Sequence, residues 1–188
     1  NARFMKEASL RLNYSSSLPN EYTSITASPF EWLEASYRYT EIKNRRYGPA
    51  SYAGNQTLKD KGFDLKVRLF KETSLIPSIA IGLRDIAGTG LFSSEYIVSS
   101  KKYNNFDFTV GLGWGALGSA GGIGNPFQSL SDKFDQRTDE DYGQGGNFSF
   151  NKWFSGKTSI LGGIEYEIPL KGLRMKLEYD TSEPDSLG

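Results

Sequence analysis

Alternation of apolar and polar side chains constrains this chain more than any other feature of its sequence. In the segment Phe63–Leu69 the odd positions are apolar, and the even positions are Asp64, Lys66 and Arg68. A period of two places one set of side chains on each face of a β-strand, whereas a helix would mix the two sets on every side. Residues 8–14, 33–39, 106–114 and 173–179 show the same alternation. The sequence therefore predicts strands with one apolar face and one polar face.

The predicted strands are joined by connections of unequal length. We expect about nine strands, at residues 3–16, 22–28, 32–40, 62–70, 78–85, 95–102, 105–115, 157–168 and 172–180. Long loops at residues 41–61, 85–94 and 115–155 fall on one side of the sheet and short turns on the other, as in outer-membrane barrels. The expected fold is all-β, an antiparallel up-and-down transmembrane β-barrel. Single-chain bacterial barrels have an even number of strands, so an odd count indicates a portion of a larger barrel, or a count that is wrong by one.

Aromatic residues make up 14% of the chain and gather near the predicted strand ends. Those expected near the long-loop rim are Tyr14, Tyr22, Tyr37, Tyr39, Phe63, Tyr96, Trp114, Trp153 and Tyr179. Those expected near the short-turn rim are Phe30, Trp32, Phe70, Tyr103, Phe106 and Tyr166. Two aromatic girdles with aliphatic residues between them are typical of strands that cross a bilayer. The alternative is that aromatic residues favour β-strands of any kind.

The composition excludes several classes of function. Lys plus Arg and Asp plus Glu both number 22, so the chain lacks the basic surface of a nucleic-acid-binding protein. It contains no cysteine and no histidine, which removes disulfides, thiolate sites and the usual general base. Glu165 and Glu167 share a strand face, as the two carboxylates of a glycosidase could. Because Arg174 and Lys176 on the next strand are equally good ion-pair partners for them, we expect a non-catalytic protein without cofactor or metal.

Four motifs have a structural interpretation beside a functional one. Residues 113–118 match the glycine spacing of a dinucleotide-binding turn, but no helical pattern follows, so a strand with small inward residues is favoured. The segment Arg84–Gly90 could bind sugar or could be a self-paired loop over the barrel mouth. A basic patch in the loop 41–61 could contact lipopolysaccharide phosphates or an acidic glycan, although a solvated loop is favoured. The longest loop could bind calcium, although the EF-hand spacing is absent and a solvated loop is again favoured. The basic patch is Lys43, Arg45 and Arg46, and the acidic residues of the longest loop are Asp132, Asp135, Asp139, Glu140 and Asp141.

The polar positions of the strands carry much of the charge. Parity places these candidate lumen residues on the wet face: Arg11, Arg38, Lys66, Arg68, Arg84, Asp107, Glu165, Glu167, Arg174 and Lys176, with Glu34, Asp64 and Glu178 beside them. An outward Lys or Arg near the bilayer midplane would cost about 2–4 kcal/mol, which inward placement avoids. The inward charges could guide a hydrated polymer, or they could pair across the barrel and fill it. Pairing is favoured for most of them.

Several strings of residues resemble one known family. They lie at residues 28–39, 59–69, 82–96, 106–115, 124–127 and 162–166, and Gly82–Tyr96 is the most distinctive. Together they resemble the YjbH-like outer-membrane proteins of exopolysaccharide and capsule clusters. The resemblance implies an outer-membrane β-barrel linked to secretion or assembly of an extracellular polysaccharide. It also implies a longer protein, since family members considerably exceed this chain in length, and it assigns no functional residues.

The expected function is therefore assistance in exporting or assembling an extracellular polysaccharide, in the outer membrane of a Gram-negative bacterium. The expected partners are outer-membrane lipid and lipopolysaccharide, the polysaccharide itself, and other secretion subunits or the remaining barrel strands. Two alternatives stay open. One is a structural or adhesive barrel with a plugged lumen. The other is a soluble β-barrel that binds an apolar ligand, which requires the aliphatic side chains to point inward.

Overall fold

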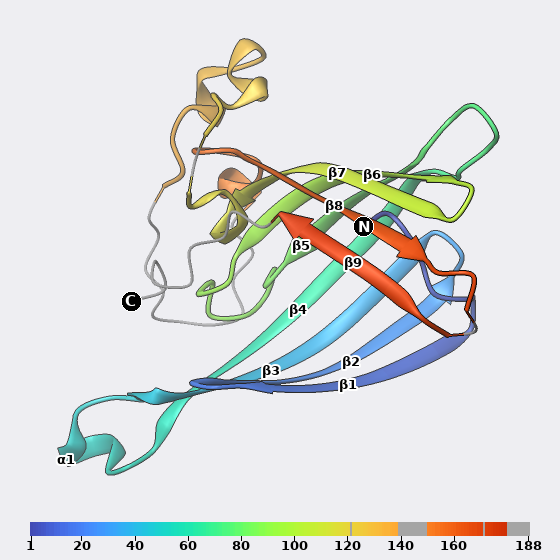
Figure 1. Ribbon diagram of the computed structural model, residues 1–188. Coiled ribbons are helices and arrows are strands. Elements are labelled where there is room, and N and C mark those ends of the chain that lie inside the picture. Colours follow the sequence, from blue (N-terminus) through green and yellow to red (C-terminus); the bar gives the residue numbers. More distant parts are fainter. Residues whose placement is uncertain (121, 139–149, 171, 180–188) are drawn as a thin grey trace.

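In the part of the chain that the structure describes, nine β-strands form one antiparallel sheet in which each strand pairs with its neighbours in the sequence (Figure 1). The computed structural model describes residues 1–120, 122–138, 150–170 and 172–179. The strands are β1 (Ser9–Ser17), β2 (Asn20–Phe30), β3 (Leu33–Arg46), β4 (Thr57–Phe70), β5 (Ser78–Arg84), β6 (Ser94–Tyr103), β7 (Phe106–Gly115), β8 (Ser159–Glu167) and β9 (Arg174–Tyr179). Among the described residues β1 and β9 have no partner on their outer edges, so the sheet is open. The prediction of an all-β, antiparallel, up-and-down sheet is confirmed.

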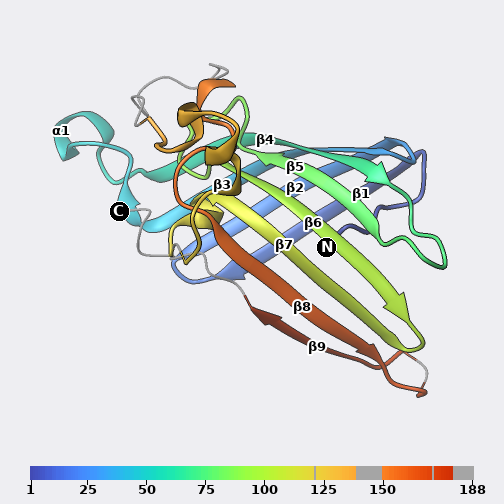
Figure 2. The same ribbon diagram turned by 90° about the horizontal axis from the view of Figure 1, so that it is seen from above.

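The sheet is strongly curved and has a concave and a convex face (Figures 1 and 2). The convex face carries the apolar residues of the alternating pattern, and many of them are open to the surroundings. Leu12 is 72% exposed, Val110 58% and Leu177 73%. The concave face carries the charged positions, and the N-terminal segment, residues 1–7, lies against it. The alternation read from the sequence thus separates apolar from charged side chains across the sheet.

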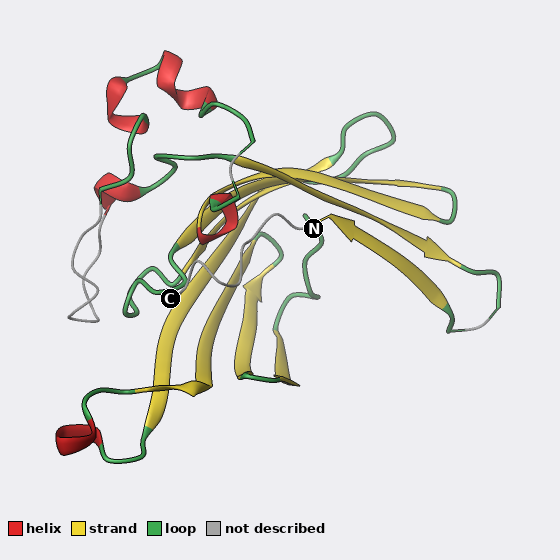
Figure 3. Cartoon of the chain, turned by 60° about the vertical axis from the view of Figure 1, so that its left-hand side comes forward, coloured by secondary structure: helices red, strands yellow, loops and turns green. Residues whose placement is uncertain are grey.

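The long connections share one rim of the sheet (Figure 3). The β3–β4 connection holds the short helix α1 (Ala50–Ala53), and residues 85–93 join β5 to β6. The described residues of the β7–β8 connection include four 3-10 helices, which are η1 (Ala116–Gly118), η2 (Pro126–Ser129), η3 (Asp132–Phe134) and η4 (Phe150–Lys152). In the part of the chain that the structure describes, no helix is both long enough and apolar enough to span a membrane.

The β7–β8 connection folds back over the end of β6 and β7, and we call residues 122–138 and 150–158 the cap. Trp114 at the end of β7 is fully buried, and its ring stacks on Phe127 and meets Phe154 edge-on at 5.2 Å between centroids. Arg137 of the cap forms an ion pair with Glu95 of β6, whose side chain is 1% exposed. The cap is therefore a packed unit and not a merely solvated loop.

Three of the aromatic residues assigned to a membrane girdle lie elsewhere. The cap buries Trp114, and the Tyr96 side chain lines cavities on the concave face. Tyr22 pairs with Thr40 and shares the parity of Thr26, which bonds to Ser36 on the concave side. Tyr22 and Tyr96 were assigned to the wrong face because a tyrosine side chain suits a polar surface as well as a membrane interface.

Three strand boundaries differ by five or more residues from those predicted. The first strand was expected at residues 3–16, but β1 begins at Ser9, after Ala8 takes a φ of 55° and redirects the chain. The loop expected at residues 41–61 is shorter, because β3 and β4 continue their pairing to Arg46 and Thr57. The extension is stabilised by opposite charges, since Glu41 faces Lys59 across the ladder.

Glycines let side chains lie close to the concave wall. A Cβ atom at Gly111 would come within 2.6 Å of the Val98 side chain. Gly115 ends β7 with a φ of 63°, and the short helix η1 follows it. The glycine-spaced motif at residues 113–118 is therefore the end of a strand, and no α-helix presents its N-terminus to a dinucleotide there.

Candidate functional site on the concave face

The candidate lumen residues lie on the concave face. Arg11, Lys66 and Arg84 line one cavity, Asp107, Glu165 and Lys176 line a second, and Glu167 and Arg174 line a third. Arg38 pairs with Asp64, and Arg68 lies over the ring of Phe4 in the N-terminal segment. The sheet thus brings candidate residues from seven strands into one hollow, because every second position of each strand faces the same way.

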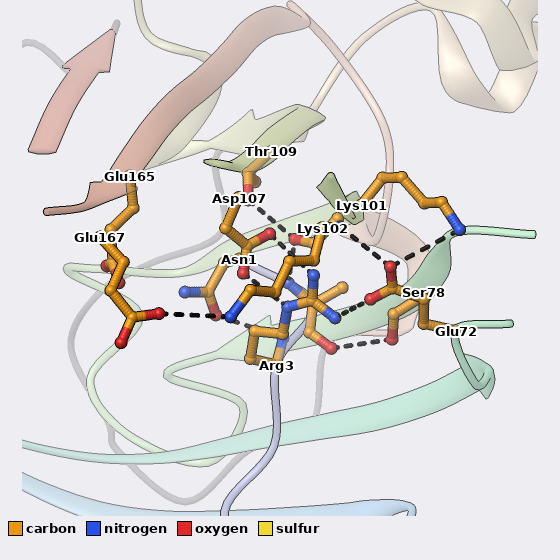
Figure 4. A network of polar contacts seen from close by, with 12 residues as sticks. Asn1, Arg3, Glu72, Ser78, Lys101, Lys102, Asp107, Thr109, Glu165 and Glu167 are labelled. Carbon is orange, nitrogen blue, oxygen red and sulfur yellow. Dashed lines mark hydrogen bonds and ion pairs between the residues drawn. The ribbon is translucent and has the colours of Figure 1, made fainter. Parts of the chain in front are cut away.

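The N-terminal segment is anchored in this hollow by Arg3 (Figure 4). Its guanidinium donates two parallel hydrogen bonds of 2.8 Å to the carboxylate of Asp107 on β7. It also pairs with Glu72 in the β4–β5 turn. The hydrogen bonds to Asp107, and secondarily those to Glu72, hold the pKa of Arg3 above its ordinary value. Bidentate charge-assisted pairing of this kind fixes both position and orientation.

The segment continues across the strands on the other side of the hollow. Lys66 of β4 donates to the Arg3 carbonyl, forms a 3.2 Å ion pair with Glu34, and lies 4.3 Å above the Phe4 ring. The backbone N–H of Met5 donates to Glu34 at 2.6 Å. These contacts use groups from β3 and β4, whereas those of Arg3 use β7, so the segment ties the two halves of the curved sheet together.

Ala2 forms the apolar centre of the same contact. It is fully buried and packs with Ala80 of β5 and Val98 of β6. Its N–H donates to Ser100 at 2.8 Å, and Ser78 donates to its carbonyl at 3.0 Å. Both backbone groups of a buried residue are therefore satisfied by serines of the wall. The sequence predicted a strand from residue 3 onward, and it held no signal that the N-terminal segment would line the interior instead.

The N-terminal segment leaves cavities beside it. One of about 290 Å³ lies over β1 to β6, and one of about 270 Å³ lies over β5 to β9. A third, of about 430 Å³, lies toward the short-turn rim. Arg84 and Tyr96 border both of the first two cavities. The N-terminal segment thus fills part of the concave face, and cavities with polar lining residues remain on both sides of it.

Most of the predicted wall charges are paired within the described residues. Glu165 pairs with Arg174 at 3.2 Å, as the sequence suggested. Glu167 pairs with Lys102 at 3.3 Å instead of with β9, and Lys176 turns to Glu178. The two glutamates considered for glycosidase chemistry are therefore engaged by cations.

The loop that joins β5 to β6 is self-paired. Asp85 is 4% exposed, its N–H donates to Asp64 at 2.9 Å, and its carboxylate accepts from the Phe92 N–H at 3.1 Å. Thr89 donates to Asp60 at 2.5 Å, and Arg38 lies 4.9 Å from the centroid of the Phe92 ring. The loop therefore folds over β3 and β4, and the Asp85 side chain helps to hold the loop in place.

Asp85 should make stability depend on pH. Burial raises the pKa of its carboxyl group to about 6 from 3.8, and the negative charge of Asp60 adds to the rise. The folded state then binds more protons than the unfolded state between these two values. Hence the free energy of unfolding should fall as pH rises through this window and then level off.

The substitution Asp85→Asn should remove this fall, and at neutral pH it should raise the unfolding temperature. Thermal unfolding of detergent-solubilised protein across that window and up to neutral pH measures it. The matched control is Asp132→Asn, an exposed carboxylate in the cap. Equal pH dependence in Asp85→Asn and in the unsubstituted protein would contradict the assignment.

Only two of the five acidic residues of the longest loop, Asp132 and Asp135, lie in the part of the chain that the structure describes. No group of three or more acidic side chains within the described ranges is placed to hold a metal ion. Asp135 accepts a hydrogen bond from Gln128. Asp139, Glu140 and Asp141 lie outside the described residues. In the basic patch, Lys43 pairs with Glu21.

Comparison with known proteins identifies the family. A family model described as "Exopolysaccharide biosynthesis protein YbjH" matches residues 1–184. The "Uncharacterized lipoprotein YjbH" of Escherichia coli (strain K12) is 47% identical over 180 residues, which cover 95% of this chain and 26% of the relative. The chain thus spans about a quarter of that relative, and no solved structure matches it. The resemblance seen in the sequence is confirmed, and the chain belongs to the YjbH family of exopolysaccharide biosynthesis proteins.

Proposed function

We propose that this chain is part of an outer-membrane β-barrel that assists the export or assembly of an extracellular polysaccharide. The observation that carries the membrane assignment is the distribution of side chains over the sheet. Leu10 is 77% exposed on the convex face, whereas Arg38 on the concave face is 5% exposed. A protein folded in water normally buries its apolar face. Apolar side chains facing outward suit a sheet surrounded by hydrocarbon.

The open sheet is consistent with this proposal. Strands in lipid need every backbone N–H and C=O paired, so a spanning sheet must close. The edges of β1 and β9, which have no partner among the described residues, would be closed by further strands, either of a longer chain or of another subunit. The fact that the chain spans about a quarter of its E. coli relative leaves room for the first possibility.

Family membership supports a role with an extracellular polysaccharide, and the side chains of the concave face support a role in its transport. Charged and hydroxyl-bearing side chains line cavities in the hollow, as a path for a hydrated polymer requires. The proposed role is non-catalytic, since the chain contains no histidine or cysteine and Glu165 and Glu167 are ion-paired. The E. coli relative is named a lipoprotein, which is consistent with an envelope location.

Gene deletion tests the proposal. Deleting the gene should reduce polysaccharide at the cell surface while polymer still accumulates inside the cell, because transport and not synthesis is removed. Both pools are measured by sugar analysis of separated surface and cell fractions, with a strain carrying the gene on a plasmid as control. An unchanged surface pool would overturn the export role.

A structural barrel with a plugged lumen is a second candidate. The anchored N-terminal segment favours it, because Arg3 and Ala2 hold that segment across the hollow. The full-length protein in planar bilayers distinguishes the two. A plugged structural barrel stays closed when Arg3→Ala weakens the anchor, whereas an export barrel gains conductance. The concave face does not suit an apolar ligand, because charged groups line it.

A further inference from the structure

The guanidinium of Arg84 lacks a partner on a wall where most cations have one. Arg3, Lys66 and Arg174 pair with carboxylates, as do Arg38, Lys102 and Lys176. Arg84 makes no hydrogen bond and no ion pair with any residue that the structure describes. The carboxylate that attracts it most strongly, Asp64, already accepts from the Asp85 N–H and pairs with Arg38. A partly buried cation without a partner is costly, and a bound anion would offset that cost.

Arg84 shares its cavity with a second unpaired cation. The cavity of about 290 Å³, which we call the Arg84 cavity, is lined by Arg11, Thr26, Ser36, Lys66, Arg84 and Tyr96, among others. Arg11, from the edge strand β1, also makes no ion pair with a described residue. Both carboxylates of the lining are engaged, Glu34 by Lys66 and Asp64 by Arg38. The cavity therefore has positive charge that its own walls do not neutralise.

Tyr96 gives the cavity an aromatic wall. It faces Gly82 across the β5–β6 ladder, and a Cβ atom at Gly82 would lie 2.1 Å from the tyrosine Cζ atom. The ring thus occupies the space that a larger residue would fill, beside Arg84 two positions along β5. An aromatic surface with a polar tip next to a guanidinium offers both stacking and hydrogen bonding to a sugar. The volume is near the lower end of the range for small-molecule sites.

We propose that the Arg84 cavity binds the anionic group of an acidic sugar, a carboxylate or a phosphate, in the polysaccharide that the protein handles. The guanidinium of Arg84 presents planar paired donors that match either anion, Arg11 adds charge from β1, and Tyr96 contacts the sugar ring. This inference rests on the proposed function and names the class of its substrate. A neutral polymer would leave both guanidinium groups without a partner.

Binding by the full-length protein in detergent tests the inference. The probes are a fluorescent oligogalacturonate, a fluorescent maltooligosaccharide of equal length, and inorganic phosphate or purified lipopolysaccharide as competitors. The oligogalacturonate should bind at least about tenfold more tightly than the neutral oligomer. Competition by phosphate alone indicates that the site accepts phosphate-bearing sugars, whereas competition by lipopolysaccharide alone indicates a lipid headgroup and overturns the polymer assignment.

Substitutions locate the binding. Arg84→Gln should weaken oligogalacturonate binding about tenfold, and Arg84→Lys should recover only part of it, because lysine keeps the charge but loses the fork of donors. The control Lys71→Gln removes one positive charge at the short-turn rim, where Lys71 is exposed and pairs with Glu31, and should leave binding unchanged. If Arg84→Gln does not fold, Arg11→Gln on the exposed strand β1 carries the same expectation.

Two results would overturn the inference: equal affinity for the charged and neutral oligomers, or full binding by both arginine variants. Neither of these binding results depends on whether the protein exports polymer. A deletion strain that still exports polymer defeats the proposed function alone. A purified protein without charge preference, from a strain whose deletion abolishes export, defeats the acidic-sugar inference alone.

Discussion

Replacing Arg137 with alanine is expected to lower the free energy of unfolding by about 3–5 kcal/mol, because it leaves a buried carboxylate without its counter-charge. Arg137 binds Glu95 through two hydrogen bonds of 2.7 and 3.0 Å, and the Glu95 side chain is 1% exposed. The same guanidinium donates to Ser93 at 2.9 Å and to the Lys152 carbonyl at 3.0 Å. One side chain therefore joins β6 to both halves of the cap.

Denaturant unfolding in detergent, followed by tryptophan fluorescence, measures this effect. Trp114 lies under the cap and reports its release. The matched control is Arg174→Ala, which breaks the exposed pair with Glu165 and should cost no more than about 1 kcal/mol. In a Glu95→Gln background, Arg137→Ala should cost much less, because no buried charge is then left behind. Equal losses from Arg137→Ala and Arg174→Ala would contradict the role of the pair.

Replacing Val110 with arginine should destabilise the membrane-inserted protein by about 2–4 kcal/mol, the cost of a lipid-facing cation near the midplane. Val110 lies in the middle of β7 and is 58% exposed on the convex face. In water, a charge at such an exposed position would change stability little. The size of the effect therefore reports what surrounds the convex face.

Folding of the full-length protein into lipid vesicles, titrated with urea, gives the measurement. The control is Tyr103→Arg, at the short-turn end of β6, where Tyr103 is 68% exposed. Near the interface the same cation should cost only about 0–1 kcal/mol. Similar small losses at both positions would indicate that the convex face does not meet hydrocarbon.

The alternating pattern predicted the sheet well because it is a local signal. Strands such as β4 and β9 carry their face assignment in their own residues, and strands that follow one another in the sequence pair with each other. The wall charges were placed for the same reason, since parity alone decides which side Lys66 or Asp107 takes. Ion pairs were harder to predict, because Glu167 reaches Lys102 on a strand that is not its neighbour.

The N-terminal segment and the cap could not be predicted, because tertiary contacts determine both. Residues 3–7 resemble the start of a strand, yet Arg3 finds Asp107 more than a hundred positions away. Trp114 resembles a girdle residue until Phe127 and Phe154 cover it. Tyr96 lies beside Arg84 because Gly82 leaves room for the tyrosine ring, and this contact crosses from β6 to β5. Contacts between residues distant in the sequence produce no periodic pattern in the sequence.

The most direct test of the account is the environment of side chains on the two faces of the sheet. Single nitroxide labels at Leu12 and Val110 on the convex face, and at Asn13 and Ser36 on the concave face, are compared in lipid vesicles by their collision rates with oxygen and with a water-soluble nickel complex. This chain contains no cysteine of its own, so each label is unique within it. The account predicts that the labels at Leu12 and Val110 collide with oxygen and are shielded from nickel, whereas those at Asn13 and Ser36 show the reverse. Nickel access at Leu12 and Val110 would contradict the claim that the convex face lies in the membrane.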